Sequence, residues 1–149
     1  MRASDVFQDR EREAVRQAVH EAELLTSGEI RVFIEDECKD DVLDRASFVF
    51  AELEMHNTGL RNGVLIYLAV QDHKFAIIGD AGIHARVGGQ FWNQVKDRML
   101  EHFKGGRFLE GILYAVREAG IRLQEFFPRQ HDDSNELPND LIMGGEGTK

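Results

Sequence analysis

The residues best suited to binding chemistry lie in two short motifs, Arg61-Asn62-Gly63 and Gly79-Asp80-Ala81-Gly82. A carboxylate, an amide and a guanidinium occur there beside glycines, whose small size lets backbone carbonyls approach a ligand. Calcium takes about six to eight oxygen ligands from carboxylates, amides, carbonyls and water. We therefore predict a divalent-cation site, with calcium favoured over other cations, formed by Asp80, Asn62 and the Gly82 loop, with Glu29 as a further ligand.

A β-hairpin is the element that would bring the two motifs together. Residues 64–70 and 75–78 are apolar runs typical of strands covered on both faces, and the polar residues 71–74 between them read as a tight turn. In an antiparallel pair the end of the second strand returns beside the start of the first. The two motifs would then meet at one edge of the sheet.

The remaining elements alternate between helices and strands. Apolar residues recur at helical spacing over residues 11–25, 42–57, 89–104 and 108–127, and residues 29–35 alternate in the manner of a strand. The order strand, helix, strand predicts a parallel pair joined by a right-handed crossover. We expect an α/β fold with a small mixed sheet of at least three strands, at about 28–35, 64–70 and 74–79, ending in the antiparallel hairpin.

Length and composition indicate a single domain. The chain has 149 residues, of which 42% are hydrophobic, and this is enough for one substantial core. We assign residues 1–128 to the domain and 129–149 to a mobile acidic tail, because the tail has few apolar residues and the chain's two prolines, Pro128 and Pro138, lie just before it and within it. Residues after about 130 should contribute little to stability.

The net charge indicates which partners the protein can bind, and the lack of long apolar segments indicates where it is located. A formal charge of −9, from 27 acidic and 18 basic residues, argues against nucleic acid and favours a cation or a protein partner. The charged start has no signal-peptide core, and no run of about 18 apolar residues occurs, so no integral membrane segment is expected. One cysteine excludes an intramolecular disulfide, and we expect a cytoplasmic protein.

Three motifs resemble those of the TPM domain family, which includes thylakoid-lumen phosphatase-like proteins and bacterial proteins. They are residues 26–32 (TSGEIRV), 61–66 (RNGVLI) and 79–83 (GDAGI), and the resemblance spans about residues 10–127. The tail sequence at 135–138 (NELP) resembles a short soluble bacterial subgroup. The resemblance implies a three-layer α/β/α sandwich with helices on both faces of the sheet, calcium binding, and in some members weak acid phosphatase activity.

A metal-dependent phosphomonoesterase is therefore the alternative to a cation-binding interaction or regulatory module. Cys38 lies in an acidic stretch and lacks a phosphate-binding glycine loop, and no covalent phosphatase motif is present. A bound cation would therefore have to polarise the phosphate or its water. His84 is the one nearby base, and it stands where many family members carry Glu. No catalytic residue can be assigned.

Each predicted ligand also has an ordinary structural interpretation. Asp80 could hydrogen-bond to its own turn, and Glu29 could form an ion pair with Arg31. The acidic stretch at residues 35–41 lacks the spacing of an EF-hand loop and fits a solvated loop, with a weaker second cation site as the alternative. The glycines match no nucleotide-binding motif, and the histidines show no zinc-binding spacing.

Overall fold

The computed structural model describes residues 2–129 and 141–144. These residues form five helices and four strands. In chain order they are α1 (Ala3–Val6), α2 (Asp9–Glu23), β1 (Glu29–Glu35), α3 (Val42–Glu52), β2 (Gly63–Ala69), β3 (Lys74–Gly79), α4 (Ala81–Lys104), α5 (Phe108–Phe126) and β4 (Leu141–Met143).

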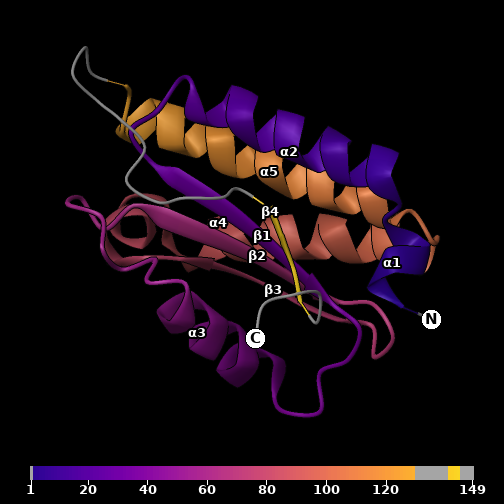
Figure 1. The fold of residues 1–149 in the computed structure, drawn as a ribbon. Helices are drawn as coiled ribbons and strands as arrows, with labels where there is room; N and C mark the ends of the chain where they lie inside the picture. The colour runs from indigo at the N-terminus through magenta and orange to yellow at the C-terminus, as the bar shows by residue number, and fades with distance from the viewer. Residues whose placement is uncertain (1, 130–140, 145–149) are drawn as a thin grey trace.

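The four strands form one mixed sheet in the order β3-β2-β1-β4 (Figure 1). β1 and β2 are parallel with α3 as the crossover, and β2 and β3 form the antiparallel hairpin, with Val64 opposite Gly79 and Ala69 opposite Lys74. The predicted α/β class, the mixed sheet, the three strands and the hairpin are confirmed. Polar residues 71–74 turn the chain, with His73 in the left-handed region at φ 54°.

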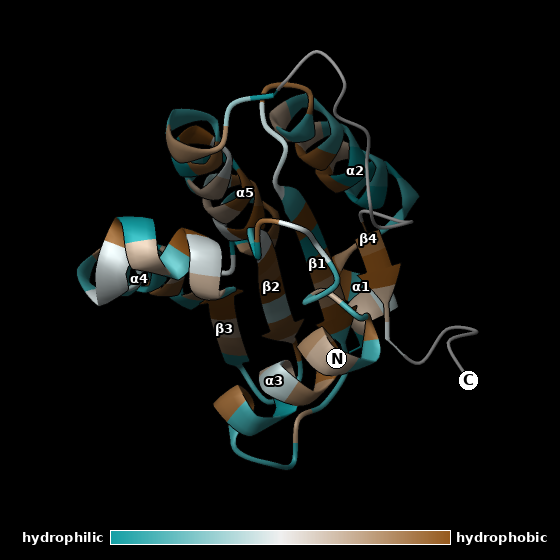
Figure 2. Ribbon diagram, turned by 90° about the vertical axis from the view of Figure 1, so that its left-hand side faces the viewer, coloured by the Kyte–Doolittle hydropathy of each residue, from teal (hydrophilic) through white to brown (hydrophobic). Residues whose placement is uncertain are grey.

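Each face of the sheet packs against helices through alternating strand residues. Ile30, Val32 and Ile34 of β1 belong to one cluster of buried side chains, which also holds residues of α2, α4 and α5. Phe33 of β1 and Tyr67 of β2 belong to a second cluster with the apolar side of α3. Figure 1 shows α3 on the side of the sheet away from α2 and α5, and Figure 2 shows the strands mostly in the brown of apolar residues. Burial on both faces explains why the strands read as apolar runs.

The expectation that the tail carries no packed element is wrong at Leu141–Met143. These residues form β4, which runs parallel to β1 with Val32 opposite Leu141 and Ile34 opposite Met143. Leu141 and Met143 are each only 7% exposed and join the first buried cluster. A strand of three residues is too short to show an alternating pattern in the sequence. It is recognised in the structure by its pairing with β1. The rest of the proposed tail, 130–140 and 145–149, lies outside the described residues.

Helix α4 begins earlier than the sequence indicated. The segment Gly79-Asp80-Ala81-Gly82, which reads as a glycine loop, is the end of β3 followed by the first turn of α4. The predicted start at Gly88-Gly89 is instead an internal break, where Gly88 adopts φ 78° and ψ 167°. Such a positive φ is easy for glycine and costly for other residues, so Gly88 separates two helical segments.

Among the described helices, none is long and apolar enough to cross a membrane.

Candidate functional site

Asp80 lies between β3 and α4, and its side chain binds the first residue of α4 and Arg61 in the loop before β2. It is the N-cap of α4, and its Oδ1 accepts a hydrogen bond from the Ala81 amide at 2.8 Å. The Arg61 guanidinium donates to both of its oxygens, from Nε to Oδ2 and from Nη2 to Oδ1, each at 2.7 Å. The Asp80 side chain is 6% exposed and that of Arg61 is 52% exposed. Asp80 thus combines a helix cap with a bidentate ion pair.

The same contacts set the charge of this carboxyl group. Burial acts to raise the pKa of Asp80, but the hydrogen bonds from Arg61 and from the Ala81 amide outweigh it, so the pKa is lowered from its ordinary value. Asp80 is therefore a carboxylate at neutral pH.

The backbones of the predicted site residues meet at Gly63. Glu29 pairs with Gly63 across the parallel strands, and the Asp80 amide donates to the Gly63 carbonyl at 2.9 Å. Two residues before Gly63, the Arg61 carbonyl accepts from the amides of Gly82 at 2.7 Å and Ile83 at 3.3 Å. The hairpin therefore brings both motifs to one edge of the sheet, as the sequence predicted.

Gly82 is needed where the loop before β2 meets the first turn of α4. A Cβ at this position would collide with the Leu60 carbonyl oxygen and would lie 2.7 Å from the Arg61 carbonyl oxygen. The glycine therefore permits a close approach between backbones, and the two carbonyls crowd the start of the helix.

Asn62 is buried in this loop, and one of its oxygens lacks a hydrogen-bond donor among the described residues. The residue is 1% exposed, its amide nitrogen Nδ2 donates to Ser27 Oγ at 3.3 Å, and its backbone amide donates to Thr58 Oγ1 at 3.3 Å. Its Oδ1 finds no hydrogen-bond donor among residues 2–129 and 141–144. A buried oxygen without a donor costs free energy, and a cation would supply the missing partner.

Glu29 lies in a buried cluster of ionisable side chains. Arg31 Nη1 is 3.8 Å from Glu29 Oε2 and 3.4 Å from Glu23 Oε2, and all three side chains are at most 4% exposed. Glu23 Oε2 also accepts from the Ile30 amide at 2.8 Å. The ion-paired interpretation of Glu29 thus describes its surroundings in this structure.

Glu23 was not predicted from the sequence, although its pKa is the one that is raised among the carboxyl groups with a resolved shift. Burial, opposed by the Ile30 hydrogen bond and supported by repulsion from Glu29, raises the pKa of Glu23 to about 8. Its position four residues after Val19, which itself follows Val15 by four, placed it on the buried side of α2. An acid in line with two core valines was the available signal.

The donor set around Asp80 decides whether a cation fits. Among the described residues there is no group of three or more His, Cys, Asp or Glu side chains that could hold a metal ion. A cation would instead rely on Asp80, the spare Asn62 Oδ1 and the Leu60 and Arg61 carbonyls. These are hard oxygen donors, which suit calcium rather than zinc. The residues therefore fit a cation by chemistry, with Arg61 as a competitor for the carboxylate.

Other residues considered in the sequence have structural partners. Cys38 is buried and its Sγ donates to the Asp40 carbonyl at 3.3 Å. In the acidic stretch, Asp41 caps α3 through the amides of Leu43 and Asp44, and Asp36 accepts from the Ala3 amide. These two acids hold the fold together locally.

His84 lies in the first turn of α4, exposed to solvent. Its Nδ1 accepts a hydrogen bond from Trp92 Nε1 at 3.1 Å, which leaves Nε2 as the nitrogen open to a ligand or water. The helix places His84 one turn after Asp80, and the His84 amide donates to the Asp80 carbonyl at 2.9 Å.

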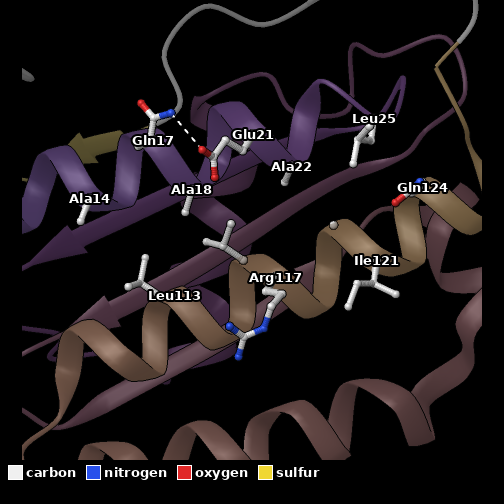
Figure 3. A pocket seen from close by; sticks show the side chains of 12 residues that line it. Ala14, Gln17, Ala18, Glu21, Ala22, Leu25, Leu113, Arg117, Ile121 and Gln124 are labelled. Carbon is white, nitrogen blue, oxygen red and sulfur yellow. Dashed lines mark hydrogen bonds between the residues drawn. The ribbon is translucent and has the colours of Figure 1, made fainter.

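A groove of about 540 Å³ lies elsewhere, between α2 and α5 (Figure 3). Small residues such as Ala18, Ala22 and Gly120 line it, with Leu25 and Ile121 at its side. None of its lining residues belongs to the predicted cation site. Nothing among the described residues indicates what would cover this apolar surface.

Comparisons with known proteins agree on the fold. The TPM domain matches residues 1–121. The NMR structure of the BA42 protein from the psychrophilic bacterium Bizionia argentinensis is similar, with a TM-score of 0.85 and 43% identity over 93% of this chain and 95% of that chain. No curated protein matches this chain.

Two more distant structures share the fold alone. The N-terminal domain of a P. gingivalis protein has a TM-score of 0.67 and 17% identity, covering 87% of this chain and 85% of that chain. The N-terminal domain of the cg2496 protein from Corynebacterium glutamicum has a TM-score of 0.53 and 11% identity, covering 89% and 76%.

Proposed function

The chain belongs to the TPM domain family, and on that premise we propose that it binds a divalent cation, calcium in preference to magnesium, at the loops around Asp80 and Asn62. In this proposal it acts as an interaction or regulatory module, whose surface near α4 changes charge when the cation binds.

The observation that carries the proposal is the buried Asn62 Oδ1, which has no hydrogen-bond donor in the part of the chain that the structure describes. It lies in the loop whose carbonyls at Leu60 and Arg61 pack against Gly82, next to the Asp80 carboxylate. A cation would give this oxygen a partner. Calcium accepts such an irregular set of oxygens, whereas magnesium demands a tighter octahedron and holds its waters.

Arg61 is central to how the site would work. Its guanidinium neutralises Asp80 through two hydrogen bonds, yet half of its side chain is exposed, so it can turn out into solvent at little cost. A cation would then replace the guanidinium at the carboxylate. Glu29 is ion-paired with Arg31 and lies opposite Gly63 in the strand pairing. It would contribute to the cation site through its backbone, or through its carboxylate if the side chain left Arg31.

A metal-dependent phosphatase is the second candidate, because the Nε2 of His84, one turn from Asp80, has no hydrogen-bond partner among the described residues. When bound, the cation would supply charge for a phosphate group, and His84 would hold or move a proton. The burial of Cys38 does not favour a thiol nucleophile.

Calorimetry of the full chain with calcium, magnesium and zinc tests the proposal. We expect saturable calcium binding. Asp80→Asn and Asn62→Leu should each weaken the calcium affinity about tenfold, because each removes about one ligand interaction. Asp97→Asn is the matched control, because Asp97 is an exposed acid on α4 and its substitution removes the same charge.

The outcomes separate the candidates. Unchanged calcium affinity in Asp80→Asn would place the ion elsewhere and refute the site, and the acidic stretch at residues 35–41 would be tested next. Phosphomonoester hydrolysis that requires the preferred ion and is lost in His84→Gln would select the phosphatase. Calcium binding without hydrolysis would select the interaction module.

A further inference from the structure

A second hollow, separate from the Asp80 loops, lies between α4 and the end of α5. It has a volume of about 380 Å³, within the range typical of small-molecule sites. Four of its residues form two crossed pairs. Arg86 of α4 lies over the Phe126 ring of α5 at 5.7 Å, and Arg122 of α5 lies over the Phe91 ring of α4 at 5.1 Å, measured from guanidinium carbon to ring centroid.

The break at Gly88 accounts for this arrangement. Arg86 precedes the break and Phe91 follows it, and the change of direction at φ 78° lets side chains from both helical segments line one hollow. Helices α4 and α5 adjoin each other in Figure 2. Stacking a guanidinium on an aromatic ring fixes its plane and leaves its N–H edge free for hydrogen bonds.

The two arginines differ in whether a carboxylate contacts their N–H edge. Arg122 Nη1 donates to Glu125 Oε1 at 2.9 Å, so one carboxylate is already present in the hollow. Arg86 forms no ion pair with any carboxylate of the described residues, although the chain has 27 acidic residues. The hollow therefore holds two guanidiniums and one carboxylate, a net charge of +1.

That charge and lining define the ligand. One further carboxylate balances a net charge of +1, whereas a phosphate dianion would meet repulsion from Glu125. A guanidinium edge matches a carboxylate through two parallel hydrogen bonds, as Arg61 and Asp80 illustrate elsewhere in this chain. Val87 and the two phenylalanine rings offer apolar contact beside it, and Gln90 and Gln94 offer amide donors.

We propose that this hollow is a binding site for a monocarboxylate with a short apolar body, whose carboxylate pairs with Arg86 and is supported by Arg122. The ligand would be either a free organic acid or the carboxyl terminus of a peptide chain. The site is independent of the proposed cation site, because none of its lining residues takes part in the loops around Asp80.

NMR titration of the full chain at constant ionic strength tests the proposal. Butyrate is the probe for a free acid, N-acetyl-leucine is the probe for a chain terminus, and N-acetyl-leucinamide lacks the carboxylate. We expect saturable shifts of the Gln90 and Gln94 side-chain amides with at least one of the two acids and none with the amide. The tighter acid identifies the source of the ligand.

Substitutions with a matched control complete the test. Arg86→Gln should weaken binding about tenfold, the value of one charge-assisted pair, and Arg86→Lys should restore only part of it. Arg98→Gln is the control, because Arg98 is also on α4 and lies over the Tyr114 ring of α5 at 5.5 Å, outside the hollow. Its affinity should equal that of the wild type.

Three results would overturn the proposal. These are the absence of saturable shifts with both acids, equal weakening by Arg98→Gln and Arg86→Gln, and inorganic phosphate binding as tightly as the acids. None of them depends on whether the chain binds calcium.

Discussion

Arg61 and Asp80 are joined by two hydrogen bonds of 2.7 Å that tie the loop before β2 to the first turn of α4. Arg61 also adopts a left-handed backbone conformation, with φ 51°, and its carbonyl accepts from the amides of Gly82 and Ile83. One residue thus binds the helix start with both its side chain and its backbone. A non-glycine residue held at positive φ costs about 1–2 kcal/mol, so the contacts around it must compensate.

Substitutions at Arg61 should separate these two roles. Arg61→Gln removes the guanidinium that competes for Asp80, so calcium affinity should rise, by up to about fivefold because the Arg61 side chain is half exposed to solvent. Calorimetry measures this directly. Arg61→Gly should be more stable to urea than Arg61→Ala by about 1 kcal/mol, because glycine adopts a φ of 51° readily. Equal or lower calcium affinity in Arg61→Gln would contradict the proposed competition.

A methyl group at Gly82 should disturb the same junction. In Gly82→Ala the new Cβ would press on the Leu60 and Arg61 carbonyls, so we expect a loss of about 1–3 kcal/mol in the free energy of unfolding, measured by urea denaturation. Gly89→Ala is the control within α4, because a Cβ there meets nothing within 4 Å. That variant should be unchanged or more stable by up to about 1 kcal/mol. Similar losses at both positions would show that the close approach at Gly82 does not decide the result.

The buried carboxyl of Glu23 should make stability depend on pH. Because burial and Glu29 raise its pKa in the folded state to about 8, the folded protein holds this proton at pH values where the unfolded chain has released it. The stabilisation is fully present below the ordinary pKa of 4.5 and is lost as pH rises through about 8. Each unit of pH in this window removes about 1.4 kcal/mol at most.

Urea denaturation between about pH 5 and pH 9 checks this linkage. Glu23→Gln keeps an acceptor for the Ile30 amide and removes the titration, so its stability should vary less with pH than that of the wild type. Glu21→Gln changes an exposed acid of the same helix and should keep the wild-type profile. Identical profiles for wild type and Glu23→Gln would show that Glu23 does not carry the proton that links stability to pH.

The sequence predicted those parts of the fold that rest on local patterns. The strands at residues 29–35, 63–69 and 74–79 were found because burial on two faces leaves apolar runs. The hairpin then determined where the motif at residues 61–63 meets the motif at residues 79–82. The start of α4 was misplaced because Gly82 reads as a loop residue. Its role, close contact with the Leu60 carbonyl, is a tertiary one that no local pattern shows.

The candidate site was predicted only in part for the same reason. The convergence of Arg61, Asn62 and Asp80 follows from hairpin geometry, whereas the left-over Asn62 Oδ1 depends on how the loop packs against Ser27 and Thr58. The burial of Glu29 with Glu23 depends on where α2 ends beside β1. Charges brought together by separate elements have no signature in the spacing of a single segment.

The pairing of β4 reverses the expectation for the end of the chain. Deletion after Arg129 removes Leu141 and Met143 from the core and leaves the edge of β1 at Val32–Ile34 without its partner strand. Burying two such side chains is worth about 1.5–3 kcal/mol each before the cost of ordering the strand. We expect a net loss of about 2–3 kcal/mol, and a melting temperature lower by about 4–12 °C in calorimetry.

Point substitutions assign this loss to β4 itself. In the full chain, the double variant Leu141→Ala and Met143→Ala should reproduce most of the drop, because both side chains are 7% exposed and face the first buried cluster. Ile142→Ala is the control in the same strand, since Ile142 is only partly buried and packs against the cluster on the opposite face of the sheet. Its effect should be smaller because less apolar surface is lost. A deletion variant that melts at the wild-type temperature would mean that β4 adds no net stability, and the domain would then end at α5 as the sequence first indicated.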